Sequence, residues 1–153
     1  MRIRLNKKGF TLIELLIVVA IIGIIAAIAI PNLLNAIQRG KQKRTMADMR
    51  AIATSVEAFA VDNNRYPGGA SSITSITSVI SPKYIKVCPT VDAWTHGYDY
   101  VATPTGNAQT YSITSYGKDG AADTIAPGPT TDFNNDIVFS TGSFLVYPEG
   151  AQQ

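Results

Sequence analysis

Residues 10–30 read FTLIELLIVVAIIGIIAAIAI, an apolar run with a single charged residue, Glu14. As a helix rising 1.5 Å per residue, this run is about 31 Å long, close to the roughly 30 Å hydrocarbon core of a bilayer. A carboxylate in hydrocarbon costs about 2.5–3.5 kcal/mol on insertion scales, so an acid at this place is expected to have a function. The sequence therefore predicts a membrane-spanning helix that carries one functional acid.

The segment ahead of this run is basic and contains no acid; its charged residues are Arg2, Arg4, Lys7 and Lys8. Under the positive-inside rule this end stays in the cytoplasm and the remainder is exported. The run is longer than the roughly 7–15 residue apolar region of a secretory signal, and no small-residue cleavage site follows it. We therefore expect a single-pass membrane protein whose globular part faces away from the cytoplasm.

A second helical pattern follows the apolar run. Apolar side chains recur every three or four residues on one face, at Met46, Met49, Ile52, Val56 and Phe59. Pro31 lacks an N–H and is expected to interrupt or kink the helix, and the breaker at residues 66–69 ends the pattern. The sequence thus predicts one helix from Phe10 to Asp62, apolar all round at first and amphipathic beyond Pro31.

The rest of the chain is expected to hold a short helix and a small sheet. The spacing of Ile73, Ile76, Val79 and Ile80 predicts the helix, and residues 116–135 are expected to be a turn-rich connection. Alternating segments predict strands at residues 98–102, 110–114, 136–139 and 144–147. The predicted fold class is α+β, with a long N-terminal helix packed on a small C-terminal antiparallel sheet.

Charge is distributed unevenly along the chain, whose net charge is +2. A basic cluster follows the apolar run, whereas residues 51–153 carry four bases and nine acids, so no nucleic-acid partner is expected. The cluster could contact anionic headgroups, although a solvated helix face is the simpler interpretation. Cys88 is the only cysteine, so no intramolecular disulfide is expected and a small buried apolar role is favoured. The basic cluster consists of Arg39, Lys41, Lys43, Arg44 and Arg50.

The stretch Lys8-Gly9-Phe10-Thr11-Leu12-Ile13-Glu14-Leu15 resembles the prepilin signature of type IV pilins and type II secretion pseudopilins. In that family a leader ends in glycine, an acid is fifth in the mature chain and a proline twenty-second, which here are Glu14 and Pro31. The resemblance implies cleavage between Gly9 and Phe10 by prepilin peptidase, N-methylation of Phe10 and polymerisation into a helical filament. It also implies an inner-membrane assembly platform and minor (pseudo)pilins as partners.

This resemblance divides the chain into four parts: a cleaved basic leader (1–9), a transmembrane filament core (10–30), an amphipathic helix (31–62) and a periplasmic domain (63–153). It further implies that the helix can loosen between Gly23 and Pro31 inside a filament. From the sequence alone these two residues are only a helix weakener and a helix breaker.

Cleavage would create an amine at Phe10, one helical turn from Glu14. In a bundle of spans that amine and the Glu14 of a neighbouring copy can neutralise each other, since each would otherwise be a lone charge in hydrocarbon. Glu14, Phe10 and Pro31 are therefore the residues expected to set subunit register and assembly. The alternative is an acid that reaches the headgroups at the cytoplasmic end of the span.

Several blocks of the distal part resemble the major pseudopilin of type II secretion, with Ala93 and Thr95 where that family usually has proline and glycine. This implies a subunit of a periplasmic pseudopilus that drives protein export. A type IV pilin of a surface fibre for adhesion or twitching is the alternative. A membrane-tethered hydrolase using His96 beside Asp92 and Asp99 is a third, without a nucleophile motif to support it. The blocks are Asp62-Asn63-Asn64-Arg65-Tyr66-Pro67, Tyr84-Ile85-Lys86, Asp92-Ala93-Trp94, Gly97-Tyr98-Asp99-Tyr100 and Ser115-Tyr116-Gly117-Lys118-Asp119-Gly120.

The connection after Gly117 is rich in acids, with Asp119, Asp123, Asp132 and Asp136 close together in sequence. Calcium takes six to eight oxygen ligands from carboxylates, amides and backbone carbonyls on a flexible loop. Composition alone favours a solvated acidic loop, but in the major pseudopilins this loop binds calcium. The resemblance therefore implies a calcium ion with Asp119 and Asp136 as the best-aligned ligands and Asp123 and Asn135 as further candidates.

Overall fold

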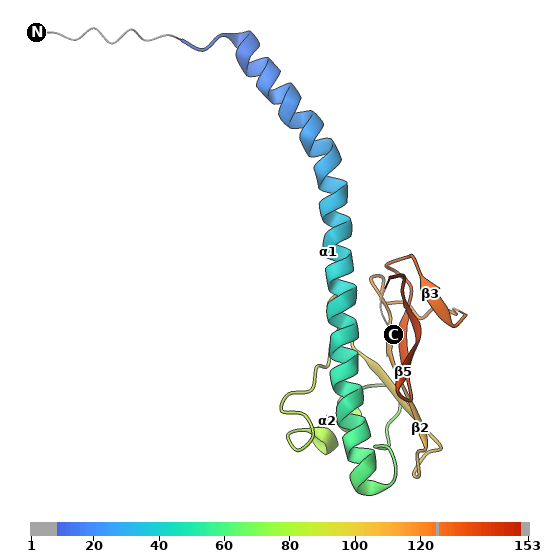
Figure 1. Cartoon of the computed structure of the whole chain (residues 1–153). Coiled ribbons are helices and arrows are strands. Elements are labelled where there is room, and N and C mark those ends of the chain that lie inside the picture. Colours follow the sequence, from blue (N-terminus) through green and yellow to red (C-terminus); the bar gives the residue numbers. More distant parts are fainter. Residues whose placement is uncertain (1–8, 125, 151–153) are drawn as a thin grey trace, which may run out of the picture. The chain divides into compact units, whose positions relative to one another are not determined.

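The computed structural model describes residues 9–124 and 126–150, so residues 1–8 of the expected leader lie outside it. These described residues form two helices and one five-stranded sheet (Figure 1). The elements are α1 (Leu12–Asn63), α2 (Thr74–Ile80), β1 (Asp99–Thr103), β2 (Thr110–Ser115), β3 (Gly128–Thr130), β4 (Ile137–Ser140) and β5 (Ser143–Pro148).

The chain divides into two compact units, with the boundary after Ile37. The described part of the first unit consists of residues 9–37 and is helical from Leu12 onward. Pro31 lies inside α1 and does not interrupt it, so of the two expected effects only a kink stays a prediction. A proline removes one backbone hydrogen bond, and the regular bonds of the turns on either side keep the chain helical.

The second unit has its core between the later part of α1, α2 and the sheet. Met46, Met49, Ile52 and Val56 are buried on one face of α1, and Phe59 packs partly buried against the same core. The amphipathic stripe predicted from their spacing is therefore confirmed. Burying such side chains contributes about 1.5–3 kcal/mol each, so this stripe supplies much of the stability of the unit.

α2 is a short helix of seven residues that buries one side. Ile76, Ile80 and the N-cap residue Ile73 have no exposed surface, whereas Val79 is 42% exposed. The predicted helix is confirmed, and only three of its four apolar residues face the core. A helix this short is marginal in isolation, so the packing of these isoleucines is what stabilises it.

The sheet has the strand order β1-β2-β4-β5-β3. β1–β2, β2–β4 and β4–β5 pair antiparallel, as predicted, but β3 pairs parallel to β5. β3 lies in the segment predicted to be only turns, because its three residues Gly-Pro-Thr are too few for a periodic signal. On β2 the side chains of Tyr111, Ile113 and Ser115 point inward, the alternation expected of a strand with one buried face.

Aromatic rings fill the space between α1 and the sheet. Tyr98, Tyr100 and Tyr111 are at most 2% exposed, and burial raises the pKa of each phenol. The hydroxyls of Tyr66 and Tyr111 donate to the two carboxylate oxygens of Glu57, at 3.1 and 3.0 Å. These rings are therefore core residues whose hydroxyls have hydrogen-bond partners.

Candidate assembly and calcium sites

Glu14 stands in the first turn of α1 and is bonded to the residue before the helix. Its Oε2 accepts hydrogen bonds from the N–H (2.8 Å) and the hydroxyl (2.7 Å) of Thr11. The Thr11 hydroxyl oxygen accepts in return from the N–H of Glu14 (3.3 Å). This reciprocal pairing is a capping box, in which an N-cap threonine and an acid three residues later satisfy each other's orphan groups.

The rest of the first unit presents apolar side chains to its surroundings. Phe10 is 79% exposed, and the apolar residues from Leu12 to Ile37 are mostly more than half exposed. Within the described part of the chain, α1 is the one helix long and apolar enough to cross a membrane. A soluble monomer rarely exposes an apolar surface of this extent, so this segment requires an apolar environment or other copies of itself.

The acidic connection forms two neighbouring loops. The N–H of Lys118 donates to the carbonyl of Phe133 at 2.9 Å, and Gly117, at φ +63°, lies directly against the carbonyls of Asn134 and Asn135. The N–H of Asp123 donates to Oδ2 of Asp136 at 3.0 Å. The structure thus brings the Gly117–Asp123 segment beside Asn134–Asp136, as a shared calcium loop would require.

Asp136 is the buried acid of this group. It is 5% exposed, and its Oδ1 has no hydrogen-bond partner among the described residues. Burial raises the pKa of this carboxyl, and the negative charges of Asp123 and Asp119 raise it further. A buried acceptor without a donor is the arrangement that a cation would relieve.

The other candidates contribute less to such a site. Oδ1 of Asp119 accepts from the N–H of Ala121, and Oδ1 of Asp132 accepts from the N–H of Asn134. In residues 9–124 and 126–150, no three acidic, histidine or cysteine side chains converge on one point. A calcium ion here would therefore need backbone carbonyls, such as that of Asn135, in addition to the carboxylates.

His96 holds the start of the acidic connection. Its Nδ1 lies 2.9 Å from the carbonyl oxygen of Gly117, and its ring packs against Gly120, where a β-carbon would come within 2.9 Å of Nε2. The hydroxyl of Ser115 donates to Asp92 (2.7 Å), and among the described residues no serine hydroxyl is bonded to the His96 ring. The side chains expected of a hydrolase are thus committed to holding loops together.

Asp92 is a buried acid that the sequence analysis did not assign to the core. Its Oδ1 accepts from the N–H groups of Trp94 and His96, both at 2.9 Å, and its Oδ2 accepts from Ser115. An aspartate followed by a tight turn is the local signal that could have identified it. The structural role of Asp99 was not predicted either: its Oδ2 accepts from the hydroxyl of Tyr116, and its Oδ1 is buried without a partner among the described residues.

An exposed apolar helix whose continuation carries a buried stripe against a small sheet defines a pilin-like subunit. The family model described as "Type II secretion system (T2SS), protein G" matches residues 32–137, and the "Prokaryotic N-terminal methylation motif" matches residues 4–30. The chain belongs to the type II secretion system protein G family, which consists of major pseudopilins. These are structural proteins, so the hydrolase alternative is excluded, and the secretion pseudopilin is favoured over the surface pilin.

Relatives are similar over most of their length. The type II secretion system core protein G of Pseudomonas aeruginosa is 34% identical over 134 residues, which cover 80% of this chain and 94% of that protein. The corresponding protein of Escherichia coli K12 is 30% identical, covering 78% and 88%. The crystal structure of the major pseudopilin from enterohaemorrhagic E. coli is 24% identical, covers 71% of this chain and 93% of its own, and has a TM-score of 0.49.

Proposed function

We propose that this chain is cleaved between Gly9 and Phe10, N-methylated on Phe10, and polymerised from the inner membrane into a periplasmic pseudopilus that drives protein export. The observation that carries this proposal is the exposed apolar surface of α1 between Leu12 and Ile37, which has Glu14 as its one acid. Such a surface is satisfied first by lipid and then by the same surface of neighbouring copies in a filament.

Glu14 would act as the register contact between copies. The capping box shows one way in which its carboxylate is held at the end of α1, with Oε2 bonded to Thr11. Its Oε1 makes no hydrogen bond to another described residue, so a neighbouring Phe10 amine could approach without breaking the cap. Pairing opposite charges offsets much of the cost of holding each alone in an apolar environment.

The topology and partners follow from the same segment. The basic residues ahead of Gly9 favour a cytoplasmic N-terminus and a periplasmic globular part. A prepilin peptidase would act at Gly9, and an inner-membrane assembly platform with minor pseudopilins would take up the processed subunit. Pro31 would mark the end of the filament core. We also expect α1 to loosen between Gly23 and Pro31 when the subunit is in the filament.

A calcium ion is proposed beside Asp136. The unpartnered buried Oδ1 of this residue, the nearby charges of Asp119 and Asp123, and the carbonyl of Asn135 supply hard oxygens of the kind that calcium binds. Bound there, the ion would neutralise the repulsion among these carboxylates and fix the two loops to each other. The role of the ion would be structural. Removing calcium should therefore weaken the fold of the second unit before it affects the membrane segment.

The experiment that tests the main proposal uses cells that express the full chain. Intact-mass analysis of the membrane-extracted protein should find the leader removed and one methyl group on Phe10. Shearing should release the protein as fibres when it is overproduced, and deleting its gene should block exoprotein export. A retained leader in the working form, or normal export after deletion, would refute the proposal.

A further inference from the structure

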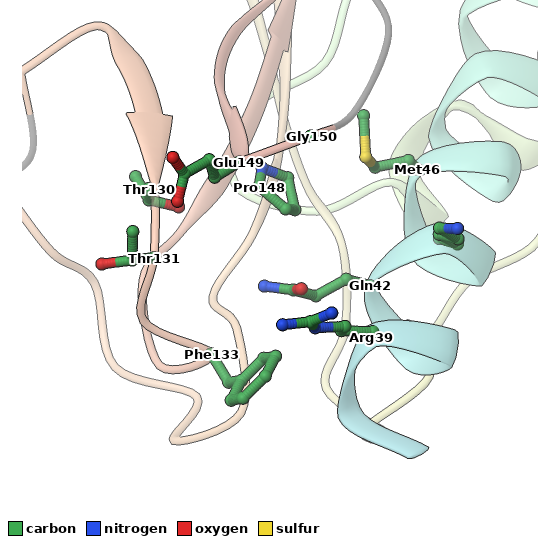
Figure 2. Close-up of a pocket in the computed structure, with 10 residues that line it drawn as sticks. Arg39, Gln42, Met46, Thr130, Thr131, Phe133, Pro148, Glu149 and Gly150 are labelled. Carbon is green, nitrogen blue, oxygen red and sulfur yellow. The ribbon is translucent and has the colours of Figure 1, made fainter. Parts of the chain in front are cut away.

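A cavity of about 410 Å³ lies in the second unit, between α1 and the end of the sheet (Figure 2). Arg39, Gln42 and Lys43 line it from α1, and Thr130, Phe133 and Glu149 line it from the strands and their connections. Its volume falls within the roughly 300–1,000 Å³ of ligand pockets. Nothing in the assembly signature or the calcium loop uses this cavity.

Gln42 makes this cavity more than a surface hollow. The residue is 6% exposed, and Figure 2 shows its amide directed away from α1 into the cavity. No hydrogen bond from this amide to another described residue is present, and its nitrogen and oxygen remain reachable from the cavity. The amide is therefore open to a polar group that enters the cavity.

The charges around Gln42 indicate which group that is. Arg39 extends beside it in Figure 2, and Lys43 is a second cation among the lining residues. A carboxylate accepts from an amide and a guanidinium at once, and such charge-assisted bonds are about twice as strong as neutral ones. Glu149 stands near Thr130 on the opposite wall, so the cations of this cavity come from the α1 side.

We propose that this cavity binds a carboxylate side chain from a second copy of the chain. Charge complementarity supports that occupant: residues 38–50 hold five bases and one acid, whereas residues 51–150 hold four bases and nine acids. Among those acids, Asp119, Asp123 and Asp132 are exposed. One copy therefore offers a basic helical segment and an acidic domain surface, which two copies can match to each other.

This inference rests on the proposed function, because polymerisation is what brings the two surfaces together. Once the apolar segments associate, the second contact forms at an effective concentration in the millimolar range and needs little affinity of its own. The cavity would then fix how one globular part sits against the next. Glu14 would set the register of the membrane segments, and Gln42 with its cations would set that of the domains.

The test uses the full chain in assembling cells. A photo-crosslinking residue, p-benzoylphenylalanine, replaces Gln42, and sheared fibres are irradiated and digested for mass spectrometry. We expect a crosslink between two copies, joining position 42 to a peptide from residues 51–150. A crosslink to lipid or to a different protein, or none in fibres that do form, overturns the inference.

A matched pair of charge variants gives an independent readout, which is needed if the photo-crosslinking variant at position 42 folds poorly. Lys43→Glu places a carboxylate in the cavity, and Lys41→Glu makes the same charge change two residues away, outside it. We expect Lys43→Glu to lower the yield of sheared fibres at least tenfold, and Lys41→Glu less than threefold, with unchanged thermal midpoints. Equal yields for the two variants would refute the inference while fibres of the unmodified chain still support the proposed function.

Discussion

Thr11 and Glu14 hold each other at the start of α1: the carboxylate accepts from both donors of Thr11, and the Thr11 hydroxyl accepts from the N–H of Glu14. Within one copy, the acid thus already serves as a helix cap. This matters for assembly because a capped carboxylate is fixed in position before a neighbour arrives. Preorganisation of this kind lowers the entropy that must be lost when the second copy binds.

Removing the acid and removing only its cap should have different consequences. Glu14→Leu eliminates both the cap and the charge offered to a neighbouring amine, so we expect no fibres in a shearing assay. Thr11→Ala eliminates the cap alone, at a cost of about 1 kcal/mol to the helix end, and should reduce fibre yield by less than tenfold. Thr11→Ser, which keeps the hydroxyl, should assemble like the unmodified chain. Normal fibres from Glu14→Leu would show that no charge pair is needed.

Calcium removal should lower the thermal stability of the second unit. A ligand present at a hundredfold its dissociation constant stabilises the folded state by about 2.7 kcal/mol, and a chelator removes that contribution. Detergent-solubilised protein, followed by the fluorescence of Trp94, should therefore melt several degrees lower in chelator than in excess calcium. Trp94 is a suitable probe because it is 8% exposed and its indole N–H donates to Gln38 at 2.8 Å.

The acidic variants make the calcium prediction specific. Asp136→Asn should abolish the difference between calcium and chelator, and Asp119→Ala should reduce it. Asp132→Ala is the matched control, since this exposed acid lies in the same connection and its Oδ1 only accepts from the N–H of Asn134. A melting temperature that is the same with and without chelator in the unmodified chain would rule out the site.

The sequence predicted those features that depend on periodicity or on a fixed spacing. The amphipathic stripe that includes Met49 and Val56, the helix around Ile76 and the four longer strands all repeat a pattern over several residues. Glu14 was identified because a single charge in a long apolar run is conspicuous. These signals are local, so they can be recognised before the chain is folded.

Features that depend on contacts between distant segments were not predictable in the same way. β3 consists of three residues, and the residues that pair with it in β5 lie far along the chain. The cavity around Gln42 forms only when α1 meets the strands, and glutamine on an otherwise basic segment looks like a solvated residue. The bond between His96 and Gly117 likewise joins two turns that the sequence shows only as separate loops.

Thr95 occupies a backbone conformation that suits glycine, with φ at +77°. A β-branched residue in the left-handed region is strained, by about 1–3 kcal/mol. The threonine is exposed, so its side chain contributes little burial in return. We therefore expect Thr95→Gly to raise the free energy of unfolding by about 1 kcal/mol, measured by urea denaturation, after the greater freedom of glycine in the unfolded chain is taken into account.

Gly117→Ala is the opposite case at a similar dihedral angle. Gly117 has a φ of +63°, and a β-carbon there would come within 2.7 Å of the carbonyl oxygen of Asn135 and closer still to that of Asn134. Because both atoms belong to the backbone, they cannot move aside, and this variant should be destabilised by more than 2 kcal/mol. A Thr95→Gly variant that is less stable than the unmodified chain would show that the threonine side chain stabilises its turn.

Asp92 should be the acid whose loss is most damaging to the second unit. It is 4% exposed and accepts from the N–H groups of Trp94 and His96 and from the hydroxyl of Ser115. Asp92→Ala would leave all three donors without an acceptor, at about 1–3 kcal/mol for each that stays buried, so we expect a total loss of at least 3 kcal/mol. Asp92→Asn keeps one carbonyl acceptor and should lose less, about 1–2 kcal/mol.

Urea denaturation followed by circular dichroism measures the stability of both Asp92 variants. Asp132→Ala is the exposed-acid control and is expected within about 0.5 kcal/mol of the unmodified chain. A loss below 1 kcal/mol in Asp92→Ala would show that water replaces the carboxylate, and that the 92–96 turn is held by its backbone bonds alone.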